Sequence, residues 1–264
     1  MMEYKHIIVE KKGHITIVTL NRPEVLNALH PYIQLELGHA LNEFEDEPNA
    51  WVAIITGTGE RAFSAGADLK WAATTSDKER REAYEKVRSQ GASLIRNFRI
   101  TKPIIAAING LAYGGGFELA LSCDLMIAAE HATFCLPEPV VGRIPSGGGI
   151  HRLVRYLPYH LAMDILLTRK RMTAQEGVQY GFVKKVVPFA QLLNEAEETA
   201  NLIMEGSPLA IRTIKQMAID GLQMTLKEAL FANFPLYNKF LQSHDFREGP
   251  KAFAEKRKPV WKGI

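Results

Sequence analysis

Cysteine is nearly absent from the chain, which has only Cys123 and Cys135 among its 264 residues. A disulfide-stapled scaffold needs several cysteine pairs at short spacing, so the sequence excludes that class. The eight histidines form no pairs at metal-ligand spacing, and neither cysteine joins them in such a motif. The sequence therefore predicts a protein of a reducing compartment that holds no metal.

An excess of charge of one sign is also lacking. The chain has 32 Lys and Arg against 29 Asp and Glu, a net charge of +3, which gives no broad basis for binding nucleic acid or a membrane. No apolar run reaches the length of a membrane span, and residues 1–14 lack the apolar stretch of a secretory signal. We expect a cytoplasmic protein, or one of an organelle matrix if a transit peptide has been removed.

Common nucleotide and nucleophile motifs are missing as well. The chain contains no Walker loop and no G-x-S-x-G nucleophile elbow. The glycines between Gly110 and Gly116 do not match G-x-G-x-x-G, so a dinucleotide site is not expected. What remains is an ordinary globular composition, 47% hydrophobic and 23% charged, which is sufficient for a sizeable core.

The first three quarters of the chain alternates between strand and helix patterns. The expected elements are a hairpin of 4–10 and 14–20, helices over 31–46, 77–99 and 117–122, and strands over 51–56, 104–108, 125–129 and 133–136. The strand over 51–56 is continuously apolar, which is typical of a strand buried on both faces. This alternation predicts an α/β fold with mostly parallel strand pairing.

The last part of the chain shows only helical patterns. Helices are expected over 192–205, 208–220, 225–242 and 245–256, and Asp245 with Glu248 resembles a capping box. We therefore predict an α/β core over residues 1–195 and a helical region over 196–264.

A triple glycine, Gly114 to Gly116, stands where a strand is followed by a helix. The first amides of a helix lack internal partners and lie at the positive end of its dipole, so they suit an anion or a polarised carbonyl oxygen. The small-residue loop 64–68 offers a second amide, and two amides aimed at one oxygen form an oxyanion hole. The structural alternative is a glycine triple that serves only packing or a turn.

Two glutamates near these glycines have unusual surroundings. Glu118 lies in the first turn of the expected helix among apolar neighbours, where a carboxylate without a task is costly; a plain helix-end glutamate is the alternative. Glu138 stands between Pro137 and Pro139, which restrict its backbone, although a surface turn has the same pattern. The chain between them can run one strand and return to the same sheet edge. Two carboxylates that meet at one water can act as general acid and general base.

Five segments together resemble a known family: NRPEVLNAL (21–29), FSAGADLK (63–70), INGLAYGGGFELALSCD (108–124), LPEPVVG (136–142) and FAEKRKPVW (253–261). They resemble the crotonase superfamily, the enoyl-CoA hydratase/isomerase group, over essentially the whole chain. The resemblance implies a spiral core of β-β-α turns and a C-terminal helical trimerisation region in a homotrimer or homohexamer. It also implies an acyl-CoA substrate, with coenzyme A as part of the substrate and no separate cofactor.

The resemblance also implies roles for individual residues. The amides of Ala67 and Gly115 would bind the thioester oxygen, Glu118 would help to activate water for attack at Cβ, and Glu138 would deliver a proton to Cα. The expected coenzyme A contacts are Leu26, Ala28, Ala65, Ala67, Asp68, Leu69, Gly115 and, from a neighbouring subunit, Lys256. Because both glutamates are present, we predict a hydro-lyase that reversibly hydrates a 2,3-unsaturated acyl-CoA to a 3-hydroxyacyl-CoA.

Departures from the pattern leave alternatives open. Cys135-Leu136 stands where many hydratases have Gly-Gln, which leaves Glu138 in drier surroundings and should raise its pKa. Leu136, together with FELAL (117–121), resembles the carnitinyl-CoA dehydratase branch, so a crotonobetainyl-CoA hydratase or another crotonase-fold lyase or isomerase is the alternative. Arg143 either meets a polar acyl group or points outward.

A non-enzymatic alternative is an RNA-binding protein of the same fold. The basic residues that would carry it belong to the expected helix 77–99 and are Arg80, Arg81, Lys86, Arg88, Arg96 and Arg99. They alternate with glutamates, so a solvated, ion-paired helix face is the stronger expectation.

Overall fold

Two sheets, of six and four strands, form the centre of the structure, a computed structural model that describes residues 3–91, 93 and 99–264. The larger sheet has the order β1 (Ile7–Lys12), β2 (Ile15–Leu20), β3 (Val52–Gly57), β5 (Ile104–Ile108), β7 (Leu125–Ala129) and β10 (Lys185–Val187). The smaller has the order β4 (Ala62–Ser64), β6 (Leu111–Tyr113), β8 (Thr133–Cys135) and β9 (Met172–Thr173). Among the described residues, only the edge strands β1 and β9 pair antiparallel, so the expected mostly parallel pairing is confirmed.

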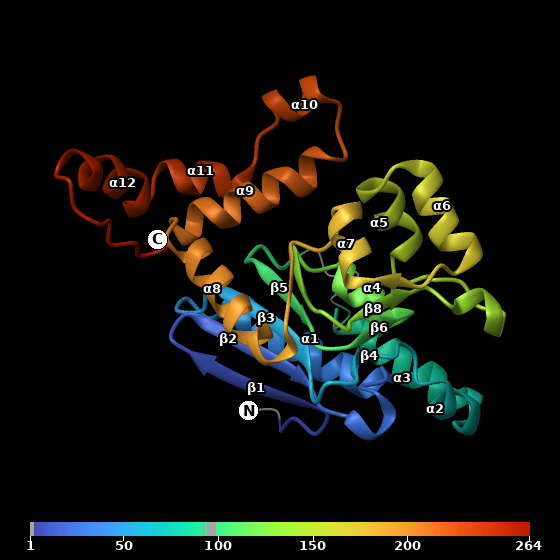
Figure 1. The fold of residues 1–264 in the computed structure, drawn as a ribbon. Helices are drawn as coiled ribbons and strands as arrows, with labels where there is room; N and C mark the ends of the chain where they lie inside the picture. Colours follow the sequence, from blue (N-terminus) through green and yellow to red (C-terminus); the bar gives the residue numbers. More distant parts are fainter. Residues whose placement is uncertain (1–2, 92, 94–98) are drawn as a thin grey trace.

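The helices fall into a set on the core and a set that projects from it (Figure 1). The first set is α1 (Pro31–Asp46), α2 (Leu69–Thr74), α3 (Asp77–Ser89), α4 (Gly115–Leu121), α5 (Gly149–Tyr156), α6 (Tyr159–Thr168), α7 (Ala174–Tyr180) and α8 (Leu192–Met204). The projecting set, called the arm below, is α9 (Pro208–Gly221), α10 (Leu226–Phe231), α11 (Pro235–Leu241) and α12 (His244–Ala254).

Chain order shows the repeat unit of the core. A strand of the larger sheet, a short strand of the smaller sheet and a helix follow one another as β3-β4-α2 and again as β5-β6-α4. This is the spiral of β-β-α turns that the resemblance implied. Each turn passes from the larger sheet to the smaller one before its helix begins.

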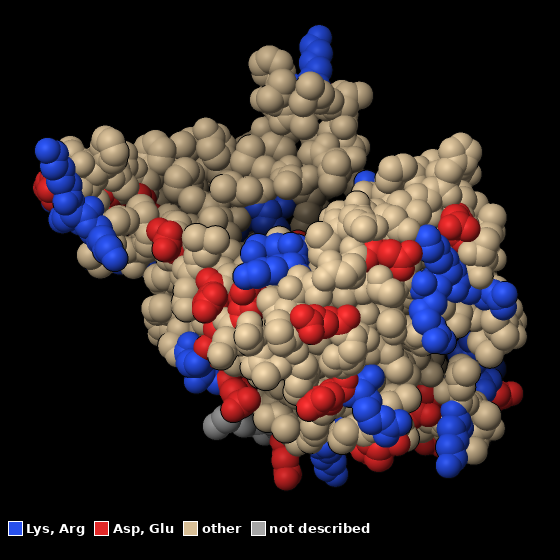
Figure 2. Space-filling view, viewed as in Figure 1, with Lys and Arg blue, Asp and Glu red and all other residues tan. Residues whose placement is uncertain are grey.

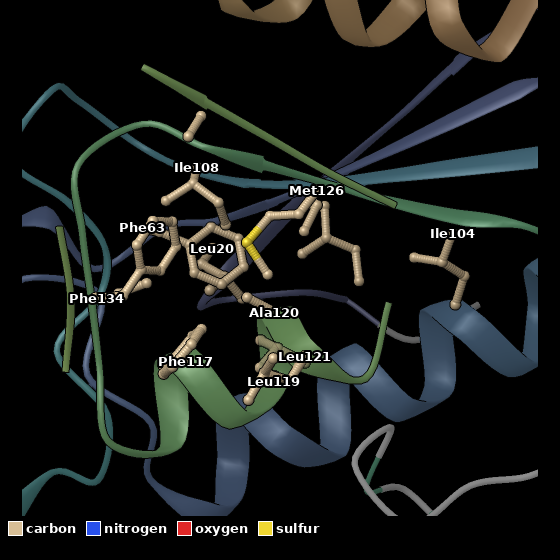
Figure 3. Packing of buried hydrophobic residues seen from close by; sticks show 14 of the residues in the cluster. Leu20, Phe63, Ile104, Ile108, Phe117, Leu119, Ala120, Leu121, Met126 and Phe134 are labelled. Atoms are coloured by element: carbon tan, nitrogen blue, oxygen red, sulfur yellow. The ribbon is translucent and has the colours of Figure 1, made fainter. Parts of the chain in front are cut away.

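The core packs on both faces of the larger sheet. On one face, α4 buries Phe117 and Leu121 against the strands (Figure 3). Leu41 of α1 belongs to the same buried cluster. On the other face, α8 packs against β3, β5 and β7. Strand β3 is buried at all six positions, as its continuous apolar run predicts.

The helix α4 approaches β4 more closely than side chains would permit. A methyl group on Gly116 would lie 2.3 Å from the carbonyl oxygen of Ser64. Glycine is therefore required at this position, because any Cβ would force the helix away from the strand. The close approach sets the spacing between the start of α4 and the loop that follows β4.

Two expectations for the arm are wrong. The single helix over 225–242 is divided into α10 and α11, and Pro235, which has no amide hydrogen, opens the second. The capping box at Asp245 is absent from the described chain, since Ser243 is the N-cap of α12 and accepts a hydrogen bond from the amide of Phe246. Asp245 is instead buried and binds the C-terminal tail through the amides of Lys262 and Gly263.

Two other boundaries differ from the expected ones. Strand β1 covers Ile7–Lys12 in place of the expected 4–10 and so ends two residues later, and β2 begins at Ile15, one residue later than expected. The expected division between residues 195 and 196 falls inside α8, where Leu192, Ala196 and Ala200 pack on the larger sheet. The helices that project from the core begin at Pro208.

The charged helix α3 ends at Ser89, ten residues before its expected end, and residues 92 and 94–98, including Arg96, lie outside the described residues. On α3, Arg80 pairs with Asp77 and Arg88 pairs with Glu85. These pairs support an ion-paired, solvated face. None of the helices in the described part of the chain is both long and apolar enough to cross a membrane.

Candidate active site

Two backbone segments that are distant in sequence direct the amide of Ala67. Leu29 donates its amide hydrogen to the oxygen of Gly66 at 2.7 Å, and its own oxygen accepts from the amide of Asp68 at 3.1 Å. Successive amides of an extended chain point to opposite sides. The Ala67 amide therefore faces away from the 26–29 segment.

The first residue of α4 lies on that open side. A methyl group on Gly115 would be 3.7 Å from the amide nitrogen of Ala67, and one on Gly66 would be only 2.8 Å from the nitrogen of Gly115. Within the described residues, neither the Ala67 nor the Gly115 amide donates a hydrogen bond. The two loops thus present a pair of neighbouring donors, the arrangement that one ligand oxygen can bridge.

Glu118 is almost fully buried one turn into α4, with 4% of its surface exposed. Its Oε1 accepts a hydrogen bond from the amide of Gly149 at 2.8 Å. A methyl group on Gly147 would lie 2.6 Å from Oε2, so the glycine loop 147–149 wraps the carboxylate. The sequence reasoning missed this loop as part of the site, although its signal, a second glycine triple before a helix, was visible.

Glu138 opens a 3-10 turn over Glu138–Val141 and turns its carboxylate toward the start of α4. A methyl group on Gly114 would be 3.0 Å from its Oε1, and Gly114 has a φ of 52°, so glycine is favoured there for two reasons. Its Oε2 is buried without a hydrogen-bond partner among the described residues. An unsatisfied carboxylate oxygen of this kind is costly unless the group is protonated or meets a ligand.

The pKa of Glu138 is raised to about 7, chiefly by burial and also by the negative charge of Glu118, against a backbone hydrogen bond that lowers it. Leu136 is fully buried two residues before it, which agrees with the drier surroundings expected from the sequence. The structure thus brings both carboxylates to the amino-terminal end of α4. They are unequal, because Glu118 has an amide donor and Glu138 has an unpaired oxygen.

The other expected contact residues differ in what they can offer a ligand. Leu26 and Ala65 are joined by a backbone hydrogen bond of 2.9 Å, and Leu69 exposes 43% of its surface beside Ala67. The carboxylate of Asp68 is occupied within the protein, since it caps α2 through the amide of Trp71 and pairs with an arginine. Ala28 is 7% exposed, so it offers chiefly its backbone.

Lys256 is not brought to the site within one chain. It follows α12 at the end of the arm, on the opposite side of the molecule from α2 (Figure 1). Among the described residues, no group of three or more His, Cys, Asp or Glu side chains could hold a metal ion. Asp124 has a structural task, because it accepts a hydrogen bond from the amide of Ile104 and pairs with Lys215.

The raised pKa of Glu138 predicts a pH-dependent stability. The folded protein holds this proton more tightly than the unfolded chain between pH 4.5 and about 7, so this group lowers stability as pH rises through that window. Glu138→Gln cannot ionise and should escape the loss. We expect its melting temperature relative to wild type to rise across the window in thermal unfolding, whereas the exposed Glu24→Gln should show a constant difference. Parallel curves for wild type and Glu138→Gln would contradict the raised pKa.

Comparison with known proteins agrees with this geometry. The family described as Enoyl-CoA hydratase/isomerase matches residues 10–264. A carnitinyl-CoA dehydratase of Salmonella arizonae is 42% identical over 259 residues, covering 96% of this chain and 97% of the relative. The carnitinyl-CoA dehydratase of Escherichia coli K12 is 40% identical over 272 residues, covering both chains completely.

Solved structures show the same fold. An enoyl-CoA hydratase from Bacillus anthracis superposes with a TM-score of 0.90 at 38% identity, covering 98% of this chain and 100% of the other. One from Mycobacterium tuberculosis has a TM-score of 0.88 at 32% identity, covering 98% and 99%. With the family matched over nearly its whole length, and the spiral core and paired amides in place, the chain belongs to the enoyl-CoA hydratase/isomerase family and has the crotonase fold.

Proposed function

We propose that this protein reversibly adds water across the double bond of a 2,3-unsaturated acyl-CoA thioester, giving a 3-hydroxyacyl-CoA. The observation that carries the proposal is the pair of Ala67 and Gly115 amides, which donate to nothing in the described residues, beside buried Glu118 and half-buried Glu138. Amides suit the thioester oxygen, and the glutamates suit the proton transfers of hydration.

The amides act first on the thioester carbonyl. With both N–H groups on its oxygen, electron density moves from the double bond toward that oxygen, and Cβ becomes open to attack. Negative charge that develops on the oxygen is stabilised by donors already in place, each contributing about 2.7–4 kcal/mol to lowering the barrier.

The glutamates then divide the proton transfers. Glu118, held by the amide of Gly149, accepts a proton from water as the water oxygen bonds to Cβ. Glu138, whose pKa is about 7, keeps a proton near neutral pH and delivers it to Cα. The water oxygen bonds to Cβ and the proton from Glu138 bonds to Cα while the π bond is lost, and dehydration reverses each step. The reaction needs no cofactor, because coenzyme A is part of the substrate.

The acyl group of the substrate has two candidate identities. The matched solved structures are named enoyl-CoA hydratases, whereas the curated relatives at 40–42% identity are named carnitinyl-CoA dehydratases. Leu136 is buried beside the carboxylates. It favours the carnitinyl-CoA dehydratases, because leucine at this position resembles that branch of the family. Arg143 is exposed, which favours the outward-pointing alternative.

A panel of thioesters separates these candidates. We expect crotonyl-CoA to be hydrated, seen as loss of the absorbance of the conjugated thioester. A kcat/KM for crotonobetainyl-CoA more than about tenfold higher, a difference of about 1.4 kcal/mol, would assign the carnitinyl-CoA reaction instead. If no conjugated thioester loses absorbance, the hydratase proposal is wrong.

The two glutamates can be tested by isosteric variants. Glu118→Gln and Glu138→Gln should each lower kcat by about 10²–10⁴-fold, because each removes one proton transfer while it keeps the shape of the site. Steady-state hydration of the best substrate from the panel measures this. Glu130→Gln, an exposed glutamate near the end of β7, is the matched control and should keep wild-type rates. Near-wild-type turnover in either site variant would rule out the proposed roles.

We propose further that the arm joins copies of the chain into a trimer or hexamer, which would bring Lys256 to a neighbouring active site. Large apolar side chains stand exposed along the arm: Leu222, Leu226, Leu230, Phe231 and Phe253, each 72–87% exposed. Figure 2 shows few charged side chains on the visible face of the arm and many of both signs on the core. Exposed apolar surface of this extent marks an association site.

Sedimentation velocity tests the assembly. The wild-type protein should sediment as three or six times the 29.5 kDa chain. Phe231→Asp places a charge in the apolar surface and should shift the distribution toward monomer, while Lys227→Glu, an exposed charge change on the same helix α10, should not. A monomeric wild type at micromolar concentration would contradict the proposal.

Both cysteines, Cys123 and Cys135, are free thiols. Free thiols are typical of a reducing compartment. This supports a cytoplasmic location.

A further inference from the structure

Arg22, two residues after the end of β2, links the two segments that direct the Ala67 amide. Its Nη1 forms an ion pair with Oδ2 of Asp68 at 2.9 Å and donates a hydrogen bond to the carbonyl oxygen of Ala28 at 2.7 Å. Asp68 follows Ala67 in the chain, and Ala28 precedes Leu29, whose backbone pairs with the Ala67 segment. One nitrogen therefore joins both sides of the pairing.

This link is well shielded from solvent. The Arg22 side chain is 15% exposed and that of Asp68 is 8% exposed. Ion pairs in such surroundings have a defined geometry, and removing one partner leaves a poorly solvated charge, unlike the weak pairs of a protein surface. Asp68 also caps α2 through the amide of Trp71, so its carboxylate is held from two directions.

The segment that Arg22 holds adopts an uncommon backbone. Leu26 and Asn27 have φ values of 55° and 53°, a strained region that residues other than glycine rarely enter. The backbone of Arg22 stabilises this turn, because its amide donates to the Asn27 side chain at 2.9 Å and its oxygen accepts from the Asn27 amide at 2.8 Å. Arg22 thus binds the strained turn with its backbone and the far segment with its side chain.

We propose that Arg22 is a positioning residue for the oxyanion hole. It does not touch the thioester; through Asp68 and Ala28 it fixes the direction in which the Ala67 N–H points. The inference rests on the proposed function, since it concerns the amide that polarises the substrate. A small rotation of this amide would weaken one of two donors and leave the rest of the binding surface in place.

The experiment measures polarisation of a bound thioester directly. Para-dimethylaminocinnamoyl-CoA is a conjugated thioester whose absorption moves to longer wavelength when its carbonyl oxygen accepts strong hydrogen bonds. In Arg22→Met we expect a smaller red shift of the bound probe, a kcat about 10- to 100-fold lower and a KM within a few fold of wild type. Arg22→Lys retains the positive charge but not the guanidinium group, so its red shift and kcat should lie between those of wild type and Arg22→Met.

A distant ion pair provides the matched control. Arg212 on α9 pairs with Glu45 at 2.9 Å near the far end of α1, and these side chains are 25% and 7% exposed. With a rise of about 1.5 Å per residue, α1 separates Glu45 from the Ala67 region by roughly 20 Å. Arg212→Met should lower the melting temperature as Arg22→Met does, yet leave the red shift and kcat unchanged.

The outcomes separate this inference from the proposed function. If Arg22→Met keeps the full red shift and kcat and loses only thermal stability, Arg22 is merely structural and the inference is wrong. If wild type shows no red shift, the oxyanion hole of the proposed function fails instead. If wild type shifts the probe but hydrates nothing, the reaction is wrong and the positioning role stands. Should Arg22→Met fail to fold, Asp68→Asn, which weakens the same link without changing shape, gives the same readout.

Discussion

A backbone-to-backbone contact between the start of α4 and the loop after β4 is the constraint on which the site depends. Gly66, Gly115 and Gly116 lie where any Cβ would meet, or nearly meet, the opposite loop. This closeness brings two amides together that hydrogen-bond to nothing in the described chain. It also places the first turn of α4, with Glu118, next to the same point. The chemistry proposed here follows from that one approach of two main chains.

Two features of the site lower the stability of the folded protein: the half-buried carboxylate of Glu138 and the strained turn at Leu26 and Asn27. Glu138 is half-buried with one oxygen unsatisfied, and a carboxylate with a pKa of about 7 weakens the folded state once it ionises. The left-handed turn at Leu26 and Asn27 adds backbone strain. A core packed on both faces of a six-stranded sheet offsets these costs, so the strain stays local.

The arm is held to the core by a different kind of contact. Buried Asp245 accepts hydrogen bonds from Ser207, Lys262 and Gly263, which ties the C-terminal tail to the junction where the arm leaves the core. The apolar side chains of Leu226, Leu230 and Phe231, farther out on α10, stay largely exposed among the described residues. Hydrogen bonds within one chain thus hold the junction in place, whereas the exposed apolar surface of the outer helices suits contact with another copy.

Much of the local structure could be predicted because neighbouring residues determine it. Helix α1 and strands β5 and β7 have the expected bounds, since each has a clear apolar period or run and a proline at or next to its start, or a turn at its end. The two carboxylates at the start of α4, Glu118 and Glu138, could likewise be singled out in the sequence, because one has apolar neighbours and the other lies between two prolines. The N-cap at Ser243 and the break at Pro235 were local signals that a longer apolar pattern concealed.

What the sequence determined by itself is the order of the elements, the two candidate acids and the glycines that permit close approach. Only the tertiary structure decided where the Ala67 amide points, which loop surrounds Glu118 and how far the pKa of Glu138 is raised. Each of these depends on atoms from segments far apart in the chain, such as Leu29 against Gly66 and Gly149 against Glu118. The direction of a hydrogen bond and the pKa of a buried acid arise from such neighbours, and no local periodicity records them.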